Sequence, residues 1–240
     1  KDLYSFYVNN TSRNKEVFKY KNNTITTTKY NVITFLPKAL FYQFMRLANV
    51  YFLFTAILNC IKIISPLASG IALVPIIFVL CVSLVRELIE DIYRAKLDRK
   101  QNNEITEVYD NSTQSFKKIQ TGKLEVGEIV RVKQDQTFPA DLILIDSNLE
   151  EGLCFIETAS LDGEKSLKIK QASMSTQGII KEDCKIEKFT GYASCDKPNP
   201  FLYHLIGKIR VTINNSNVET PLNAKQLLLK GAQLRNTQYI

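Results

Sequence analysis

The chain has 240 residues, enough for one or two domains, and 45% of them are hydrophobic, an ordinary share for a folded protein. Five cysteines without a Cys-x-x-Cys pair argue against a disulfide framework, and one histidine, His204, without neighbouring ligands argues against a structural zinc site. The net charge of +7 is concentrated in residues 1–46, which carry eight basic and two acidic side chains, so it favours the cytoplasmic flank of a membrane segment over nucleic-acid binding.

Residues 1–36 are predicted to form a basic cytoplasmic arm. The first 30 residues are polar, rich in Asn, Thr and Lys, and show little periodicity. We therefore expect an extended segment or loops there, without a regular element.

A first transmembrane helix is predicted over residues 37–65. It opens at Pro37, a position where proline is tolerated, and residues 47–61 carry no charge. That uncharged stretch would be about 22 Å long, short of the roughly 30 Å hydrocarbon layer. Arg46 and Lys62 can extend toward opposite interfaces and make up the difference. Taken alone, the stretch is also compatible with a buried helix of a soluble protein.

A second transmembrane helix with a cytoplasmic stalk is predicted over residues 66–101. Residues 63–85 form an uncharged run long enough to cross a bilayer. The helical spacing of apolar residues continues to about Lys100, with Glu90 and Arg94 as a favourable i,i+4 pair, and Asn102-Asn103 are expected to end the helix. The two helices together predict an α-helical transmembrane hairpin whose flanks both lie in the cytoplasm.

Residues 102–240 are predicted to form a mostly-β, jelly-roll-like domain on the cytoplasmic side. From residue 105 the pattern changes to short apolar or β-branched runs separated by turn residues, while residues 172–200 are less regular. Strands are expected at 105–109, 116–120, 126–132, 141–146, 154–158, 206–213 and 226–229.

One acidic stretch in this domain, residues 157–168, carries the candidate site. Asp162-Gly163 is a turn signal between apolar flanks, so we expect Glu164 to point outward at the tip of a loop. On its own such a tetrapeptide is typical of a solvated hairpin loop.

Many short blocks along the chain match one family in collinear order. They are Asn23-Thr24-Ile25, Thr28-Lys29-Tyr30-Asn31, Thr34-Phe35-Leu36-Pro37-Lys38, Gln43-Phe44, Arg46, Ala48-Asn49, Tyr51-Phe52-Leu53, Ile64-Ser65-Pro66, Glu90-Asp91, Arg94, Asp98, Asn102, Val126-Gly127, Phe138-Pro139-Ala140-Asp141, the 157–164 stretch, Lys197-Pro198-Asn199, Leu202-Tyr203, Leu229-Lys230-Gly231 and Leu234-Arg235-Asn236-Thr237. With these blocks the chain resembles the N-terminal quarter of a type IV P-type ATPase, the phospholipid flippases.

The resemblance implies that residues 93–240 form most of an actuator domain, ending before that domain is complete. In the family this domain brings its acidic loop to a phosphorylated aspartate on another domain. Glu164 would orient and activate the hydrolytic water, Gly163 would allow close approach, and Asp162 would shape the turn. Lys165 departs from the family, which usually has threonine there, or serine in other branches. A hydroxyl can hold the attacking water, whereas an ammonium group cannot accept a hydrogen bond from it.

The resemblance also implies a substrate route and partners. Asn59 and Cys60 fall where the first helix contributes to the lipid headgroup path. ATP and Mg²⁺ would bind the full-length parent outside this chain, and none is expected within it. The implied partners are membrane phospholipid, the downstream phosphorylation and nucleotide-binding domains, and a two-span accessory subunit, with no nucleic acid.

Three functions remain open from the residues. The first is a phospholipid translocase of the plasma membrane or of Golgi and endosomal membranes, moving lipid from the outer to the cytoplasmic leaflet. The second is a membrane-anchored β-domain without catalysis, an adaptor or a decayed paralogue. The third is a cation-pumping P-type ATPase, because the Pro139-Ala140-Asp141 block is shared across P-type pumps.

Overall fold

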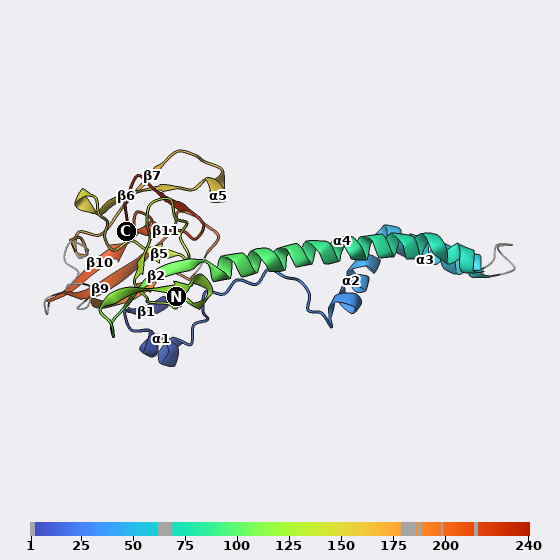
Figure 1. The fold of residues 1–240 in the computed structure, drawn as a ribbon, viewed down its shortest axis with the longest axis horizontal. Coiled ribbons are helices and arrows are strands. Elements are labelled where there is room, and N and C mark those ends of the chain that lie inside the picture. The colour runs from blue at the N-terminus through green and yellow to red at the C-terminus, as the bar shows by residue number, and fades with distance from the viewer. Residues whose placement is uncertain (1–2, 62–68, 179–185, 187–188, 198, 214–215) are drawn as a thin grey trace. The chain divides into compact units, whose positions relative to one another are not determined.

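The computed structural model describes residues 3–61, 69–178, 186, 189–197, 199–213 and 216–240. Its internal contacts divide the chain into two units: Lys1–Thr24 together with Asn102–Ile240, and Ile25–Gln101. We call the first the β unit and the second the helical unit (Figure 1).

The β unit contains antiparallel sheets. A four-stranded sheet has the order β1-β8-β9-β10, with β1 at Tyr4–Val8, β8 at Thr190–Cys195, β9 at Gly207–Ile213 and β10 at Ser216–Leu222. Three-stranded sheets have the orders β3-β2-β4 (Ser115–Gln120, Ile105–Asp110, Val130–Arg131) and β12-β6-β7 (Gln233–Arg235, Leu153–Glu157, Lys168–Gln171). β11 (Leu227–Leu228) pairs with β5 (Leu142–Ile143), and single 3₁₀ turns lie at Thr121–Lys123 and Glu150–Gly152. A mostly-β domain is therefore confirmed.

Two apolar clusters form the core of the β unit. Each strand turns alternate side chains to opposite faces, so each short run supplies a few buried residues. The first cluster consists of Val132, Phe138, Leu144, Cys154, Ile156, Ala172, Leu228, Ala232, Leu234 and Ile240. The second consists of Val8, Tyr109, Ile186, Phe189, Ala193, Ile209, Val211 and Leu222.

The sequence predicts an extended arm or loops at the N-terminus, and this prediction is wrong for most of residues 4–18. β1 pairs along its whole length with β8, from Tyr4 opposite Cys195 to Val8 opposite Gly191. Helix α1 (Thr11–Phe18) follows, with the side chain of Asn10 accepting a hydrogen bond from the amide of Arg13. β1 forms by pairing with a strand more than 180 positions away, and local periodicity cannot show such a pairing.

Contacts of Asn14 and Gly127 attach this N-terminal segment to the rest of the unit. The buried Asn14 side chain donates to the carbonyl oxygens of Tyr7 (2.8 Å) and Val126 (2.9 Å) and accepts from the amide of Tyr7 (2.7 Å). Gly127 has φ +91°, and a Cβ atom there would lie 2.3 Å from the Tyr7 carbonyl oxygen. Only glycine permits that approach.

The helical unit contains α2 (Phe35–Phe44), α3 (Leu47–Cys60) and the 35-residue helix α4 (Ser69–Asn103), whose last two residues belong to the β unit. The long helix ending at Asn103 agrees with the prediction. Within the described residues no single helix combines the length and apolarity needed to cross a membrane, although the pair α2 and α3, bent by 88°, meets the same test by length and composition. Residues 62–68, which include the predicted boundary between the two spans, lie outside the described residues.

The first predicted span is therefore not one helix. Arg46 has extended backbone angles (φ −79°, ψ 121°) and separates α2 from α3. The buried Asn49 side chain donates to the carbonyl oxygen (2.7 Å) and the side-chain oxygen (3.2 Å) of buried Gln43. These bonds satisfy a carbonyl group at the end of α2 and so stabilise the break.

Acidic side chains of α4 hold residues 27–30 in an extended path along that helix. Asp98 accepts from the amide and the hydroxyl of Thr27, both at 2.7 Å, and Asp91 accepts from the amide of Lys29 at 2.9 Å. Glu87 accepts from the hydroxyl of Tyr30 at 2.5 Å. The 4- and 7-residue spacings place these acids on one face of α4.

Candidate catalytic loop

The acidic loop connects two antiparallel strands of one sheet. β6 and β7 pair with Ile156 opposite Lys168, and the chain between them contains the single turn α5 (Ala159–Asp162). Buried Thr158 starts the turn, and its carbonyl oxygen accepts from the amides of Leu161 (2.8 Å) and Asp162 (3.1 Å). The backbone of the loop is therefore fixed at its base.

Gly163 ends the turn in the left-handed conformation. It has φ +78°, and its amide donates to the carbonyl oxygen of Ala159 at 3.2 Å. A Cβ atom built there would meet nothing within 4 Å, so glycine is needed for its backbone angles and not for lack of space. Ser160 adds a bond from its hydroxyl to the carbonyl oxygen of Gly231 at 2.6 Å.

Asp162 is the hydrogen-bonding centre of the loop. Its carboxylate accepts from the Thr158 hydroxyl (3.0 Å), the Glu164 amide (2.9 Å), the Lys168 ammonium (2.5 Å) and the Tyr203 hydroxyl. The hydrogen bonds from Lys168 and then Tyr203 hold the pKa of Asp162 well below its usual range. Asp162 thus accepts several hydrogen bonds as a permanent anion, and this geometry suits the turn-forming role that the resemblance implies.

Glu164 follows as an exposed carboxylate. Its side chain is 60% exposed, and one oxygen lies 3.0 Å from the ammonium nitrogen of Lys168. The expected outward position of Glu164 is observed, while its catalytic role, like those of Asp162 and Gly163, stays a prediction. With one oxygen held and the group open to solvent, it can accept a proton or orient a water molecule.

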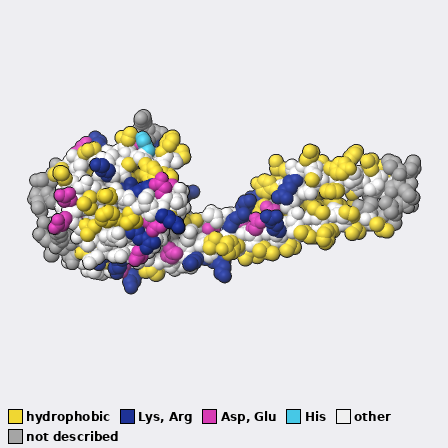
Figure 2. Space-filling model, turned by 90° about the horizontal axis from the view of Figure 1, so that it is seen from above, with side chains coloured by type: hydrophobic (Ala, Val, Ile, Leu, Met, Phe, Trp, Pro, Cys, Tyr) yellow, Lys and Arg dark blue, Asp and Glu magenta, His cyan; other side chains and the backbone are white. Residues whose placement is uncertain are grey.

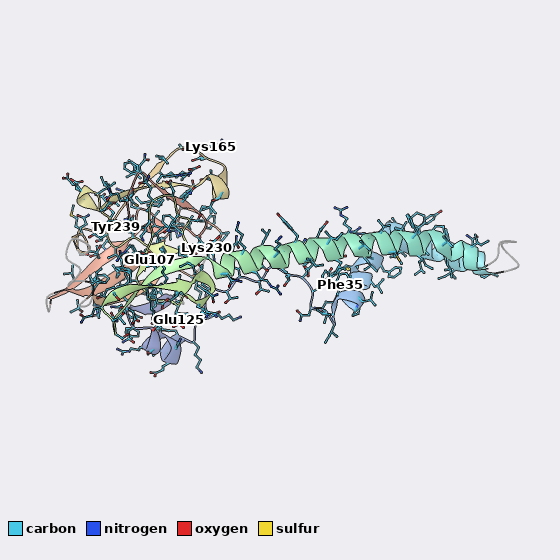
Figure 3. The ribbon with its side chains drawn as sticks, in the orientation of Figure 1. Phe35, Glu107, Glu125, Lys165, Lys230 and Tyr239 are labelled. Atoms are coloured by element: carbon cyan, nitrogen blue, oxygen red, sulfur yellow. The ribbon has the colours of Figure 1, made fainter. Side chains whose placement is uncertain are left out.

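Lys165 lies on the outer edge of the loop (Figure 3) and is exposed. The cation beside Glu164 is Lys168, four residues further on, at the start of β7. Hydrogen bonds to Asp162 and then Tyr203 raise the pKa of Lys168 above its ordinary value, so it remains charged. Sequence reasoning concentrated on Lys165 and gave no role to Lys168, Thr158 or Tyr203.

The proposed headgroup residues belong to the helical unit, which is described by itself. Asn59 lies in the last turn of α3 and is partly exposed. Cys60 is the last residue of that helix, and its side chain lies outside the described part of the chain. Their role in a substrate path stays a prediction.

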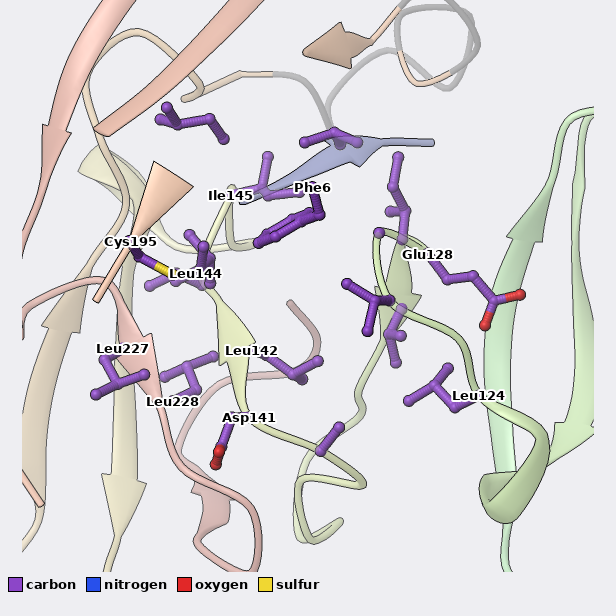
Figure 4. Close-up of a pocket in the computed structure, with 18 of the residues that line it drawn as sticks. Phe6, Leu124, Glu128, Asp141, Leu142, Leu144, Ile145, Cys195, Leu227 and Leu228 are labelled. Atoms are coloured by element: carbon purple, nitrogen blue, oxygen red, sulfur yellow. The ribbon is translucent and has the colours of Figure 1, made fainter. Parts of the chain in front are cut away.

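A separate cavity of about 670 Å³ lies between the two apolar clusters of the β unit (Figure 4). The residues that line it and are labelled in Figure 4 include Phe6, Leu142, Leu144 and Leu228, with Glu128 at its polar edge. Burial raises the pKa of Glu128. No residue of the 157–168 loop lines this cavity, and in the described ranges no three His, Cys, Asp or Glu side chains are grouped to hold a metal ion.

Comparisons with known proteins agree on one family. Residues 6–73 match the model "Phospholipid-translocating ATPase N-terminal", and residues 100–191 match the model "P-type ATPase actuator domain". The chain is 41% identical over 221 residues to probable phospholipid-transporting ATPase 11 of Arabidopsis thaliana, covering 92% of the chain and 18% of the relative. It is 41% identical over 224 residues to phospholipid-transporting ATPase DRS2 of Saccharomyces cerevisiae (93% and 16%) and 38% identical over 221 residues to phospholipid-transporting ATPase IC of Homo sapiens (92% and 17%).

These matches include the acidic loop within the actuator model and extend over more than nine-tenths of the chain, which spans less than a fifth of these relatives' length. The chain belongs to the phospholipid-transporting ATPases, the type IV branch of the P-type ATPases.

Proposed function

We propose that this chain supplies the dephosphorylation loop of an ATP-driven phospholipid translocase. Glu164 would accept a proton from, and orient, the water that attacks an aspartyl phosphate on another domain of the full-length protein. The observation that supports this role most directly is the exposed Glu164 carboxylate on a loop whose backbone is held by Asp162. Gly163 would contribute by leaving the approach to the phosphate free of a side chain.

The contacts of Asp162 support a division of labour between two acids. Asp162 accepts hydrogen bonds from Thr158, Glu164, Lys168 and Tyr203 and stays ionised, so it would keep the loop in shape. Among the residues that the structure describes, Glu164 forms one ion pair, and its side chain remains 60% exposed to water. We infer that Lys165, exposed at the edge, is a tolerated variant of the family's threonine and that it can approach the phosphate as a positive charge.

The transport function is a proposal for the whole protein. Members of this family are membrane proteins that use ATP and Mg²⁺, and we propose that both bind outside this chain. Residues 37–65 and 66–101 would form the transmembrane hairpin, with α2 and α3 as a broken first span and the jelly-roll-like β unit in the cytoplasm. Lipid would pass from the outer to the cytoplasmic leaflet, with Asn59 and Cys60 on its route.

Large exposed apolar side chains along the helical unit support this assignment. On the face seen in Figure 2 hydrophobic side chains cover much of that unit. Examples are Phe54, Phe78 and Val85, each more than half exposed. Exposure of so many apolar side chains to water is unfavourable, whereas contact with the hydrocarbon chains of lipid is not. The plasma membrane or Golgi and endosomal membranes, and a two-span accessory subunit, are further parts of the proposal.

The test measures phosphoenzyme decay in the full-length protein. Glu164→Gln is expected to slow dephosphorylation about 100-fold or more while the phosphoenzyme still forms, because the amide cannot take a proton. Lys165→Thr should leave turnover equal or faster. Glu150→Gln, an exposed glutamate elsewhere in the β unit, is the matched control and should change nothing. An unchanged decay rate in Glu164→Gln would remove Glu164 from the mechanism, and a collapse of turnover in Lys165→Thr would show that the lysine is required.

A further inference from the structure

Tyr203 reaches the acidic loop from a different sheet. It lies in the connection between β8 and β9, which is closed at its base by a bond from the Asp196 amide to the Ile206 carbonyl oxygen at 3.0 Å. The amide of His204 donates to the carbonyl oxygen of Phe201 at 3.4 Å and forms a turn around Tyr203. This connection belongs to the four-stranded sheet, whereas the acidic loop joins strands of the β12-β6-β7 sheet.

The Tyr203 hydroxyl completes a three-group contact. It donates to the Oδ2 atom of Asp162, and the Lys168 ammonium donates to the same atom. The Lys168 nitrogen also donates to the Tyr203 oxygen and lies 4.4 Å from the centre of the tyrosine ring. The Tyr203 side chain therefore contacts the Lys168 ammonium group in two ways, through a hydrogen bond to its hydroxyl oxygen and a cation–π contact with its ring.

That ammonium group is the one that holds Glu164. Lys168 lies 3.0 Å from a Glu164 carboxylate oxygen, and its own side chain is only 23% exposed, against 60% for Glu164. An ammonium has three protons to donate, and Asp162, Tyr203 and Glu164 accept them. If Tyr203 loses its hydroxyl, one of the three directions is free and the nitrogen can move relative to Glu164.

We propose that Tyr203 is a positioning residue for dephosphorylation, acting through Lys168 to hold the Glu164 carboxylate in one orientation; this inference rests on the proposed role of Glu164. Lys168 contacts both Tyr203 and Glu164 and so links the two side chains. Tyr203 itself touches neither the water nor the phosphate. Its effect on the rate therefore depends on the presence of a functional carboxylate at position 164.

The test is a double-mutant cycle in the full-length protein, with phosphoenzyme formation and decay measured separately. Tyr203→Phe keeps the ring and removes the hydroxyl, and it is expected to slow decay about tenfold while formation is unchanged. In the Glu164→Gln background the same substitution should slow decay less than twofold, because the group it positions is already lost. Lys168→Met should resemble Tyr203→Phe, and Lys168→Arg should restore much of the rate.

Tyr192→Phe is the matched control. Tyr192 is a partly exposed tyrosine on β8 whose ring packs against Tyr7, and its replacement should leave decay unchanged. If Glu164→Gln slows decay but Tyr203→Phe does not, the inference is overturned and the proposed function stands. Equal slowing by Tyr203→Phe in both backgrounds would also overturn it, because that result indicates a structural role. If Glu164→Gln has no effect, the proposed function itself fails.

Discussion

The β unit and the helical unit differ in where their large apolar side chains lie. In the β unit the largest fully buried side chains are apolar, led by Phe138, Phe189 and Ile156. In the helical unit the buried residues include Gln43, Asn49, Asp91 and Asp98, while large apolar side chains are exposed along α3 and α4. The first arrangement is stable in water because apolar surface is removed from it.

The second arrangement leaves large apolar side chains exposed and buries several polar ones. Its polar groups pair with one another, as Asn49 does with Gln43 and Asp98 with Thr27. Such pairs satisfy buried groups, and each contributes on the order of 1 kcal/mol of net stability, more where a carboxylate takes part. The difference indicates that the β unit folds around its own core, and it supports the proposal that the helical unit lies in lipid.

The largest expected effect concerns the core of the β unit. Phe138 is 1% exposed, and its backbone bonds to Gly231 and Ala232 fix it within the first apolar cluster. Phe138→Ala should lower the free energy of unfolding by about 3–5 kcal/mol, since it removes a large buried ring and leaves a cavity. Denaturant unfolding of the 240-residue chain in detergent measures this change.

Phe201→Ala is the control for that substitution, because Phe201 is 70% exposed in the same unit. It should change the free energy of unfolding by no more than about 0.5 kcal/mol. Equal effects of the two substitutions would contradict the claim that the β unit owes its stability to buried apolar residues.

A smaller effect is expected in the helical unit. Phe78 on α4 is 67% exposed, so Phe78→Arg removes little packing but places a charge on the apolar surface. If that surface faces lipid, insertion should become about 2.5–3.5 kcal/mol less favourable. The measurement is the fraction of the chain that stays with microsomal membranes after alkaline extraction.

Phe78→Leu, which keeps the side chain apolar, should leave that fraction unchanged. If Phe78→Arg is retained as well as the unmodified chain, the exposed apolar face does not contact lipid, and the contrast between the two units loses its explanation.

Parts of the β unit could be predicted within a residue because their pattern is local. The strands expected at 105–109 and 116–120 are observed at Ile105–Asp110 and Ser115–Gln120, paired as a hairpin. The strand expected at 154–158 is observed at Leu153–Glu157. In each case a short apolar or β-branched run is bounded by turn residues, so neighbouring positions carry the signal.

Other parts depend on specific contacts that the pattern of apolar residues does not show. β1 needs β8, and the break between α2 and α3 needs the Asn49 side chain to bond Gln43. Of the run expected as a strand at 126–132, the strand β4 covers Val130–Arg131. None of these outcomes follows from hydrophobic periodicity, because each depends on a specific partner that the periodicity does not identify.

The candidate site also has one part that the local sequence predicts and another that depends on the fold. The left-handed Gly163 and the exposed Glu164 follow from the Asp-Gly turn signal in the sequence. Tyr203 is 41 residues from Asp162 and comes from another sheet, so only the fold could bring the two together. The Leu202-Tyr203 block was visible in the sequence, but nothing local connected it with the acidic loop.

The smallest expected effect concerns acids on the surface of the β unit. Asp110, at the end of β2, accepts from the hydroxyl (2.7 Å) and amide (3.1 Å) of Ser112 and from Lys117 (3.0 Å). The hydrogen bond from the Ser112 hydroxyl, followed by that from Lys117, lowers the pKa of Asp110 from 3.8 to about 2. Because the folded state has the lower pKa, it binds this proton less readily than the unfolded state does.

The contribution of Asp110 to stability should therefore be present in full above pH 4 and decline as the pH falls toward 2. Asp110→Asn should flatten the acid side of the stability profile in that window, and Glu150→Gln should leave it unaltered. A profile that stays the same in Asp110→Asn would show that the Ser112 and Lys117 contacts do not persist in solution. Buried Phe138, by contrast, should contribute equally at every pH in this range, since an apolar ring has no proton to exchange. The pH dependence thus separates the two sources of stability within the β unit itself.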